Sequence, residues 1–146
     1  EYAMNYWRDN GAPAEKLLAG FPTYGKTFSL QNPSNNGIRA PASGPGPMGD
    51  FTGEPGYLAY YEICRFLDSG ATKASNEPQD VPYAYKGSEW VGYDNVNSFG
   101  LKAEWLNNNS FGGAMVWALD MDDFTGDFCH QGKYPLIYAL KGSLEL

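Results

Sequence analysis

Two short apolar runs, each followed by a helical pattern, constrain the fold of this chain more than any other feature. The runs are KLLAGFPTY at residues 16–24 and FGGAMVWALD at residues 111–120, and we expect both to be buried strands. Helical patterns cover residues 2–10, 96–107 and 135–142. With the middle of the chain set aside, the order is helix, strand, helix, strand, helix. This alternation predicts an α/β fold with a parallel sheet or a β/α barrel.

The length of the chain limits how this alternation can close. Two strand–helix units within 146 residues cannot form an eight-stranded barrel, which needs about 250 residues. A small open sheet would expose its edges, and exposed edges invite aggregation. We therefore predict the C-terminal part of a (β/α)8 barrel, built from residues 1–26 and 95–146. The first ten residues lack the pattern of a signal peptide, so we expect a mature segment or a piece of something longer.

Residues 27–94 form the insert between the two units. Gly and Pro crowd residues 29–56, and a loop of this length in a compact domain is usually functional or disordered. A helical pattern follows at 57–67, and then come short strand patterns at 71–75, 81–85 and 89–93, with a hairpin turn expected at Lys86–Gly87. We predict an α+β domain inserted on a loop at the C-terminal face of the barrel, where barrel enzymes keep their sites.

Charge and hydropathy exclude two classes of partner. Ten Lys and Arg against seventeen Asp and Glu give a net charge of -7, which argues against nucleic acid, because its phosphates require a basic surface. No apolar run approaches the roughly 20 residues of a membrane helix, so we expect no membrane partner. The aromatic content of 16% fits either a tyrosine-rich core or a cleft for sugars or peptides, and composition alone favours the core.

The cysteines and a glycosylation sequon indicate the compartment. Cys64 and Cys129 lie far apart, and with a single histidine they make a metal site improbable, so we predict no metal and no cofactor. An even number of cysteines fits one disulfide in an oxidising compartment. Asn108 opens the sequon Asn-Asn-Ser, a predicted glycosylation site that agrees with a secreted, extracellular protein.

Tyr24 and Lys26 lie where the first strand runs into the insert. A phenol and an ammonium at the carboxyl end of a strand can donate hydrogen bonds into a cleft. The alternative is a structural role, in which Pro22 and Gly25 shape the turn and Tyr24 covers the core. The spacing of these residues does not separate the two interpretations.

Trp117 and the acidic residues after it raise the same question at the second strand. An indole can stack on a sugar ring or pack in a core, and physical arguments alone favour the core. Asp120, Asp122 and Asp123 could supply a general acid, a calcium site or loop solvation and capping. Calcium needs six to eight oxygen ligands, and the spacing of an EF-hand is missing. We therefore favour solvation and capping.

The helix expected at 96–107 has an N-cap candidate in Asp94–Asn95. Its expected buried positions are Phe99, Leu101, Trp105 and Leu106.

Four blocks together resemble the C-terminal half of family 18 glycoside hydrolases, and animal chitinases and chitinase-like lectins in particular. The blocks are GFPTYGKTF, GYLAYYEICRF, VPYAYKGSEWVGYDN and FGGAMVWALDMDDF, in that order, and the resemblance runs from about Ala3 to Leu140. It implies a secreted eight-stranded barrel with a small α+β domain after the seventh strand. Lys16–Tyr24 would be the seventh strand and Gly112–Asp120 the eighth.

The resemblance also implies roles for individual residues. Trp117 matches a tryptophan that floors the subsite of the reacting sugar, and Tyr24 matches a sugar-contacting tyrosine. Lys26 falls where several active members carry Arg or His, and Arg and Lys are not equivalent donors. Glu54 matches an acidic residue that faces bound sugar further along the cleft. Cys64 and Cys129 match a disulfide that ties the inserted domain to the last barrel loop.

Family 18 enzymes cleave β-1,4-linked N-acetylglucosamine with retention and with help from the substrate's own N-acetyl group. Their catalytic acid is a Glu that ends an Asp-x-x-Asp-x-Asp-x-Glu run on the fourth strand, and this run does not occur here. We therefore expect the chain to supply cleft wall and floor, without a catalytic residue, to the rest of the parent barrel. The predicted parent is a secreted chitinase acting on chitin or chito-oligosaccharides, and the 146 residues alone should be inactive. The alternatives are a non-catalytic chitinase-like lectin and an independently folded carbohydrate-binding fragment.

Overall fold

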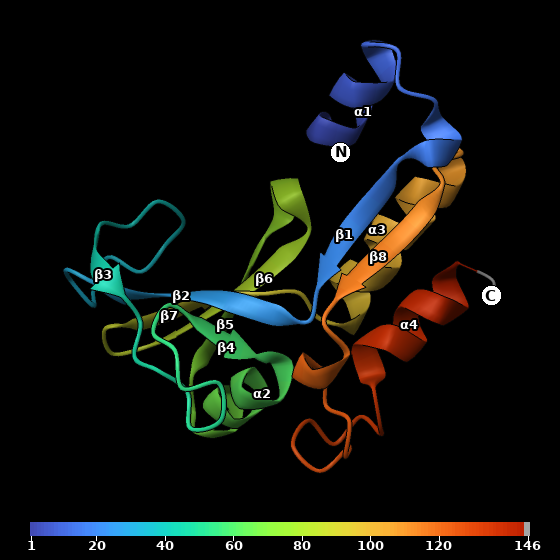
Figure 1. Ribbon diagram of the computed structural model, residues 1–146. Coiled ribbons are helices and arrows are strands. Elements are labelled where there is room, and N and C mark those ends of the chain that lie inside the picture. Colours follow the sequence, from blue (N-terminus) through green and yellow to red (C-terminus); the bar gives the residue numbers. More distant parts are fainter. Residues whose placement is uncertain (145–146) are drawn as a thin grey trace.

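The computed structural model describes residues 1–144, which form two sheets joined at one point (Figure 1). The first sheet and its helices contain the two ends of the chain. Its elements are α1 (Tyr2–Asp9), η1 (Ala14–Lys16), β1 (Leu18–Pro22), α3 (Val96–Asn108), β8 (Gly113–Trp117), η3 (Leu119–Met121) and α4 (Pro135–Ser143). The predicted alternation of helix and strand is present, and both strands are shorter than the sequence suggested.

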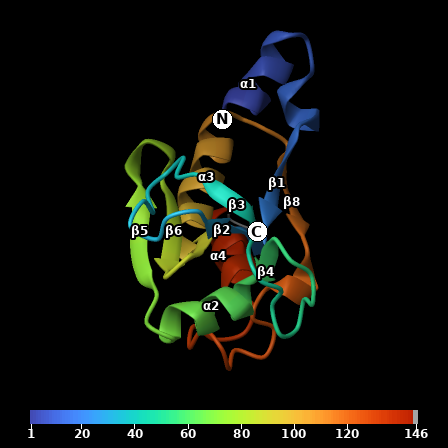
Figure 2. The ribbon, with the colours of Figure 1, turned by 90° about the vertical axis from the view of Figure 1, so that its left-hand side faces the viewer.

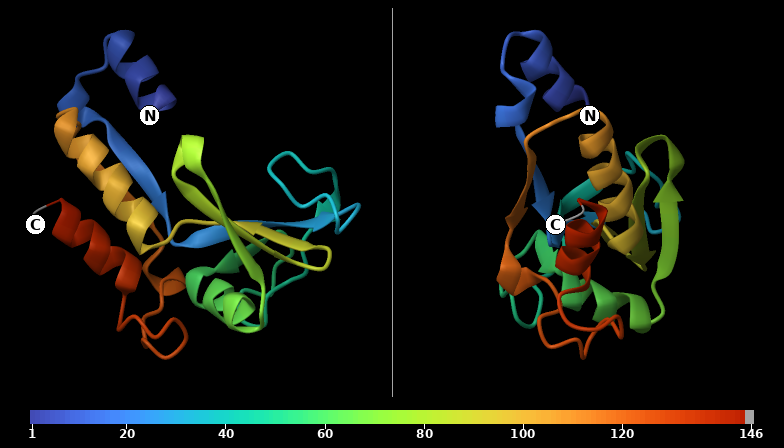
Figure 3. Two further views of the ribbon diagram at one scale, coloured as in Figure 1. Left: turned by 180° about the vertical axis from the view of Figure 1, so that it is seen from behind. Right: turned by 90° about the vertical axis from the view of Figure 1, so that its right-hand side faces the viewer.

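Strands β1 and β8 pair in parallel, from Leu18 beside Gly113 to Pro22 beside Trp117. Helices α3 and α4 cover one face of this pair, as the view from behind shows (left panel of Figure 3), and the rings of Phe21 and Phe99 meet edge to face at 5.0 Å. On the other face the side chains are open. Residue Leu18 is 56% exposed and Met115 is 45% exposed. The described residues thus cover one face of β1 and β8, and burial of both faces stays a prediction for a longer protein.

The second sheet is antiparallel and has the order β3-β2-β7-β6-β5, and β4 pairs with the start of β2 on the same edge as β3. Its elements are β2 (Tyr24–Leu30), β3 (Ala42–Pro45), β4 (Tyr57–Ala59), α2 (Tyr60–Asp68), β5 (Thr72–Asn76), η2 (Glu77–Gln79), β6 (Val81–Lys86) and β7 (Glu89–Gly92). Helix α2 packs below one face (Figure 2), where Ile63 and Val91 are buried. This is an α+β unit of the predicted kind.

Two details of the second sheet differ from the expected elements. The run expected as one helix at 57–67 splits into β4 and α2, because the Glu62 side chain accepts the backbone N–H of Ala59 at 3.0 Å and starts the helix there. The chain enters the second sheet at Tyr24, before the expected boundary after residue 26. The expected hairpin is present, with Lys86 paired to Glu89 and a glycine between them at a φ of 57°.

Helix α3 begins where the sequence predicted. Asn95 accepts a hydrogen bond from the backbone N–H of Ser98, and the Ser98 hydroxyl accepts one from the Asn95 N–H, each at 2.9 Å. Phe99 and Leu106 are buried as expected. Leu101 is 42% exposed, so the prediction of its burial is wrong; it lies on the face of α3 away from the sheet.

The predicted disulfide is present: Cys64 on α2 is bonded to Cys129 in the loop between η3 and α4. The bond ties the second sheet's helix to the loop that follows β8. Within residues 1–144, no helix is long and apolar enough to cross a membrane.

Candidate functional site

Thr23 joins the two sheets and holds the ends of the two parallel strands together. It is fully buried, and its backbone N–H donates to the Trp117 carbonyl at 3.2 Å while its hydroxyl donates to the Ala118 carbonyl. Its own carbonyl accepts the Tyr60 N–H at 3.0 Å, at the start of α2. One residue therefore fixes β1, β8 and α2 at a common point. The backbone that carries the neighbouring Tyr24 and Trp117 side chains is therefore held in place.

Trp117 is the last residue of β8, and its indole is 65% exposed. The peptide bond that follows it is cis. The structure thus places Trp117 outside the core of the described residues, against the core interpretation that its strand position favoured. An exposed indole at the carboxyl end of a β/α strand presents a flat apolar plate where ligands of such folds bind.

A cluster of two tyrosines and a lysine lies beside the indole. The Lys26 Nζ atom is 5.5 Å from the ring centroid of Tyr24 and 5.4 Å from that of Tyr57, and the two rings meet edge to face at 5.9 Å. The register explains this, because Tyr57 on β4 lies directly opposite Lys26 on β2. Together with Trp117 and Met121, these residues line a hollow of about 190 Å³.

Glycine at position 25 lets the cluster face the hollow. A Cβ there would lie 2.8 Å from both the Ile63 and Val91 side chains, so only Gly allows α2 to pack this closely beneath β2. Because side chains alternate along a strand, packing Gly25 downward turns Tyr24 and Lys26 to the opposite face. The structure thus brings Tyr24, Lys26 and Trp117 together, and their roles in binding a sugar stay predictions.

Glu54 lies on the exposed loop before β4 and acts on Tyr57. The Glu54 carboxylate beside the Tyr57 hydroxyl raises the pKa of Tyr57, and Asp120 adds a smaller contribution. Glu54 does not line the hollow itself, but it borders the cluster through Tyr57.

The three acidic residues after Trp117 divide into two kinds. Asp120 is exposed, whereas Asp122 and Asp123 are fully buried. Asp122 accepts the Ile137 N–H at the start of α4 at 3.1 Å, and Asp123 accepts the N–H groups of Gly126, Phe128 and Cys129. The predicted capping role is thus confirmed for Asp122 and Asp123, whose carboxylates accept backbone N–H groups of the loop and of α4. The predicted solvation of these two side chains is wrong, because both are buried. Burial raises the pKa of Asp122, although its backbone hydrogen bonds oppose the shift.

The remaining predicted residues are placed as follows. Asn108 is exposed at the last position of α3, where its sequon is accessible, and glycosylation stays a prediction. Among residues 1–144, no group of three or more His, Cys, Asp and Glu side chains could hold a metal ion. The only histidine, His130, faces Asp68 at 3.7 Å on the surface.

Sequence reasoning missed three residues of this site: Thr23, Tyr57 and Met121. Thr23 could have been noticed as a polar residue inside an apolar run. Tyr57 was assigned to a helix, and only its true strand register places it opposite Lys26. Nothing in the sequence marks Met121, which reaches the hollow through the short η3 turn.

The sequence pattern of glycosyl hydrolases family 18 matches residues 1–122, most of the chain. The chain belongs to this family. Its members' barrel domains share the fold described above, so the α/β class and the barrel assignment are confirmed. The division of this family 18 chain at residues 26 and 94 stays a prediction.

Individual relatives show how much of a family 18 protein this chain represents. Oviduct-specific glycoprotein of Bos taurus is 54% identical over 98% of the chain and 26% of its own length. A solved structure of human YKL-39, a pseudo-chitinase with retained chitooligosaccharide binding, has 52% identity and a TM-score of 0.95 over 99% of this chain and 39% of that one. An immunomodulatory active chitinase from Trichuris suis has 39% identity and a TM-score of 0.96 over 99% of this chain and 40% of that one. The chain therefore spans between a quarter and two fifths of these proteins.

Proposed function

We propose that this chain forms one wall and part of the floor of a cleft that binds oligomers of β-1,4-linked N-acetylglucosamine. The single observation that carries the proposal is the hollow in which the exposed indole of Trp117 meets Tyr24, Lys26 and Tyr57. A pyranose ring has one face of C–H groups, which an indole covers, and hydroxyl groups at its edge, which phenol and ammonium groups bind. Glu54 would serve a sugar further along the same wall.

We propose that the rest of the cleft around the sugar is formed by other parts of the parent protein. The open faces of Leu18 and Met115 fit further barrel strands, which the parent would supply. A disulfide and an exposed sequon fit a secreted, extracellular parent. The human relative that retains chitooligosaccharide binding supports the ligand class, at 52% identity.

The second candidate is hydrolysis of chitin by the parent, with retention and with assistance from the substrate's N-acetyl group. The active chitinase from Trichuris suis favours it, whereas the pseudo-chitinase at higher identity favours a lectin. The chain holds no Asp-x-x-Asp-x-Asp-x-Glu run. The binding proposal therefore holds whether the parent is an enzyme or a lectin. Turnover of a labelled chitotriose by the full-length protein, compared with a variant lacking the Glu of that run, decides between enzyme and lectin.

Replacing Trp117 with alanine in the full-length protein tests the binding proposal. We expect Trp117→Ala to weaken chitotetraose binding by about 2 kcal/mol or more, or about 30-fold, as for other aromatic anchors. Trp117→Phe should lose less, because it keeps an aromatic plate. The control is Leu119→Ala, which removes a side chain of similar exposure, 62%, two residues away.

Titration calorimetry gives the affinities, and the melting temperature of each variant is measured on the same samples. Folded Trp117→Ala protein that binds chitotetraose as tightly as the unaltered protein would refute the proposal. If Trp117→Ala is unfolded, Trp117→Phe is measured in its place. The proposal would then be refuted if Trp117→Phe binds chitotetraose as tightly as Leu119→Ala does.

A further inference from the structure

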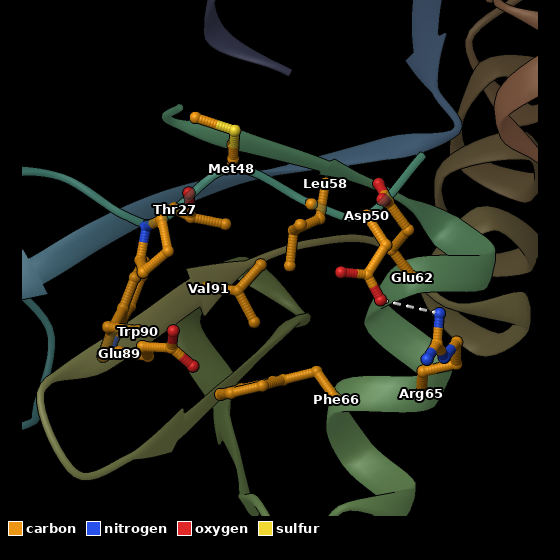
Figure 4. A pocket seen from close by; sticks show the side chains of 12 residues that line it. Thr27, Met48, Asp50, Leu58, Glu62, Arg65, Phe66, Glu89, Trp90 and Val91 are labelled. Carbon is orange, nitrogen blue, oxygen red and sulfur yellow. Dashed lines mark hydrogen bonds and ion pairs between the residues drawn. The ribbon is translucent and has the colours of Figure 1, made fainter. Parts of the chain in front are cut away.

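A second pocket lies on the face of the antiparallel sheet opposite the sugar-binding cluster. Side chains alternate along β2, so Thr27 points away from the face that carries Lys26. The loop at 45–50 crosses this far face and leaves a pocket of about 270 Å³. Leu58, Val91 and Phe66 form its apolar lining (Figure 4). None of these residues lines the hollow beside Trp117.

The walls of this pocket are fixed before any ligand arrives. The buried Glu62 carboxylate accepts the N–H groups of Phe51 at 2.8 Å and Thr52 at 3.2 Å, which holds the end of the loop in place. Gly49 lies so close to this carboxylate that any side chain there would collide with it. Across the opening, Arg65 and Asp50 form an ion pair at 3.0 Å. Pre-formed pockets of this kind favour binding, because little has to be ordered.

The polar groups that line the pocket favour a ligand that carries positive charge and hydrogen-bond donors. Three carboxylates and one guanidinium line the pocket. Asp50 is paired with Arg65, and the Glu62 carboxylate accepts three backbone N–H groups, so the carboxylate left to meet a ligand is that of Glu89. Within residues 1–144, Glu89 makes no ion pair of its own. Figure 4 shows the Asp50 and Glu89 carboxylates on opposite sides of the pocket with Val91 between them. The lining residue Thr27 is 5% exposed, and its hydroxyl oxygen has no hydrogen-bond partner.

We propose that this pocket binds a small organic cation, a primary amine carried on an apolar aryl or alkyl body. The apolar floor takes the body, and the Glu89 carboxylate takes the ammonium. The pocket volume of about 270 Å³ suits a small ligand, and we take 2-phenylethylammonium as its representative. The proposal stands apart from sugar binding, because the two pockets lie on opposite faces of one sheet.

The test uses the full-length protein with 2-phenylethylammonium as the probe and 2-phenylethanol as its neutral counterpart. Saturation-transfer NMR gives the contacts and titration gives the affinities at pH 7. We expect the ammonium to bind at least fivefold more tightly than the alcohol and to lose this advantage as salt is raised. Equal binding of the two compounds, or no binding of the ammonium, would overturn the proposal.

Matched variants locate the probe. Glu89→Gln removes one carboxylate of the pocket and should weaken ammonium binding at least threefold, whereas Glu104→Gln changes an exposed carboxylate on α3 and should leave it unchanged. Saturating chitotetraose should not displace the probe. Displacement by the sugar, or equal affinities of the two variants, would show that the probe binds elsewhere and would refute this pocket without touching the sugar proposal.

Discussion

The two sheets of this chain bury their apolar surface in different ways. The antiparallel sheet is closed on one face by its own helix: Ile63 of α2 is buried against β2 and β7 of the same unit. The parallel pair β1–β8 is covered by α3 and α4 on one face only, and on the other face Met115 and Trp117 are open. The antiparallel unit thus contains the helix that covers its sheet, whereas the parallel pair leaves one face uncovered by the described residues.

This difference separates a structural requirement from a functional one. Apolar side chains in the middle of an open strand, such as Met115, require cover, because contiguous exposed apolar surface is rare in soluble proteins. Trp117 lies at the strand's carboxyl end, where Thr23 fixes the backbone and polar groups surround the indole. We therefore attribute the exposure of Met115 to missing packing, and the exposure of Trp117 fits the proposed sugar contact.

The disulfide is the strongest link between the two regions, and its removal should have the largest effect. The double variant Cys64→Ser/Cys129→Ser opens a loop of 65 residues, which the chain-entropy model values at about 4 kcal/mol. We expect the full-length protein to lose about this much free energy of unfolding in chemical denaturation. Reduced unaltered protein serves as the control, and a loss below about 1 kcal/mol in both samples would show that the packing alone holds the regions together.

A pair of core substitutions tests whether the open face is covered in the parent. Ile63→Ala should cost about 3 kcal/mol wherever it is measured, because α2 and the sheet already enclose this side chain. Met115→Ala should cost about 2 kcal/mol in the full-length protein, where further strands would bury it. Denaturation curves give both values. A Met115→Ala cost near zero in the full-length protein would contradict a closed barrel.

The sequence predicted those parts of the fold that local pattern determines. Apolar runs located β1 and β8, and the Asp94–Asn95 cap located the start of α3. The split of residues 57–67 into β4 and α2 was not predictable, because the Glu62 contact to the Ala59 N–H overrides a continuous helical pattern. Leu101 failed for a different reason: it lies two residues after Phe99, about 200° round the helix, so the helical period itself places it on the face opposite Phe99.

The candidate site was predictable to the extent that it lies at strand ends. Position made Tyr24, Lys26 and Trp117 candidates, but it left a structural role open for the first two and favoured the core for Trp117. Only the family resemblance indicated contact with a sugar. Tyr57 joins them through a strand pairing between residues about thirty positions apart, which no local pattern reveals. Asp122 and Asp123 resembled a solvated acidic loop, and only the path of the chain back to α4 shows that they are buried.

The smallest predicted effect concerns Asp122, in the barrel loop that meets the inserted unit. Burial raises the pKa of this carboxyl in the folded state above its ordinary value of 3.8. The folded protein therefore binds this proton more tightly than the unfolded chain does. The resulting stabilisation is complete below about pH 3.8 and is lost as the pH rises through the raised folded-state pKa.

Replacing Asp122 with asparagine should remove this pH dependence. The amide cannot ionise, so the free energy of unfolding of the unaltered protein, minus that of Asp122→Asn, should fall as the pH rises from about 4 toward neutrality. Asparagine has one oxygen where Asp122 uses two, for the Ile137 and Asp123 N–H groups, so the variant also loses a constant, pH-independent amount. The matched control is Asp127→Asn, which changes an exposed carboxylate in the same loop. A difference that rises with pH for Asp122→Asn would mean that the backbone hydrogen bonds outweigh burial and hold the carboxylate charged.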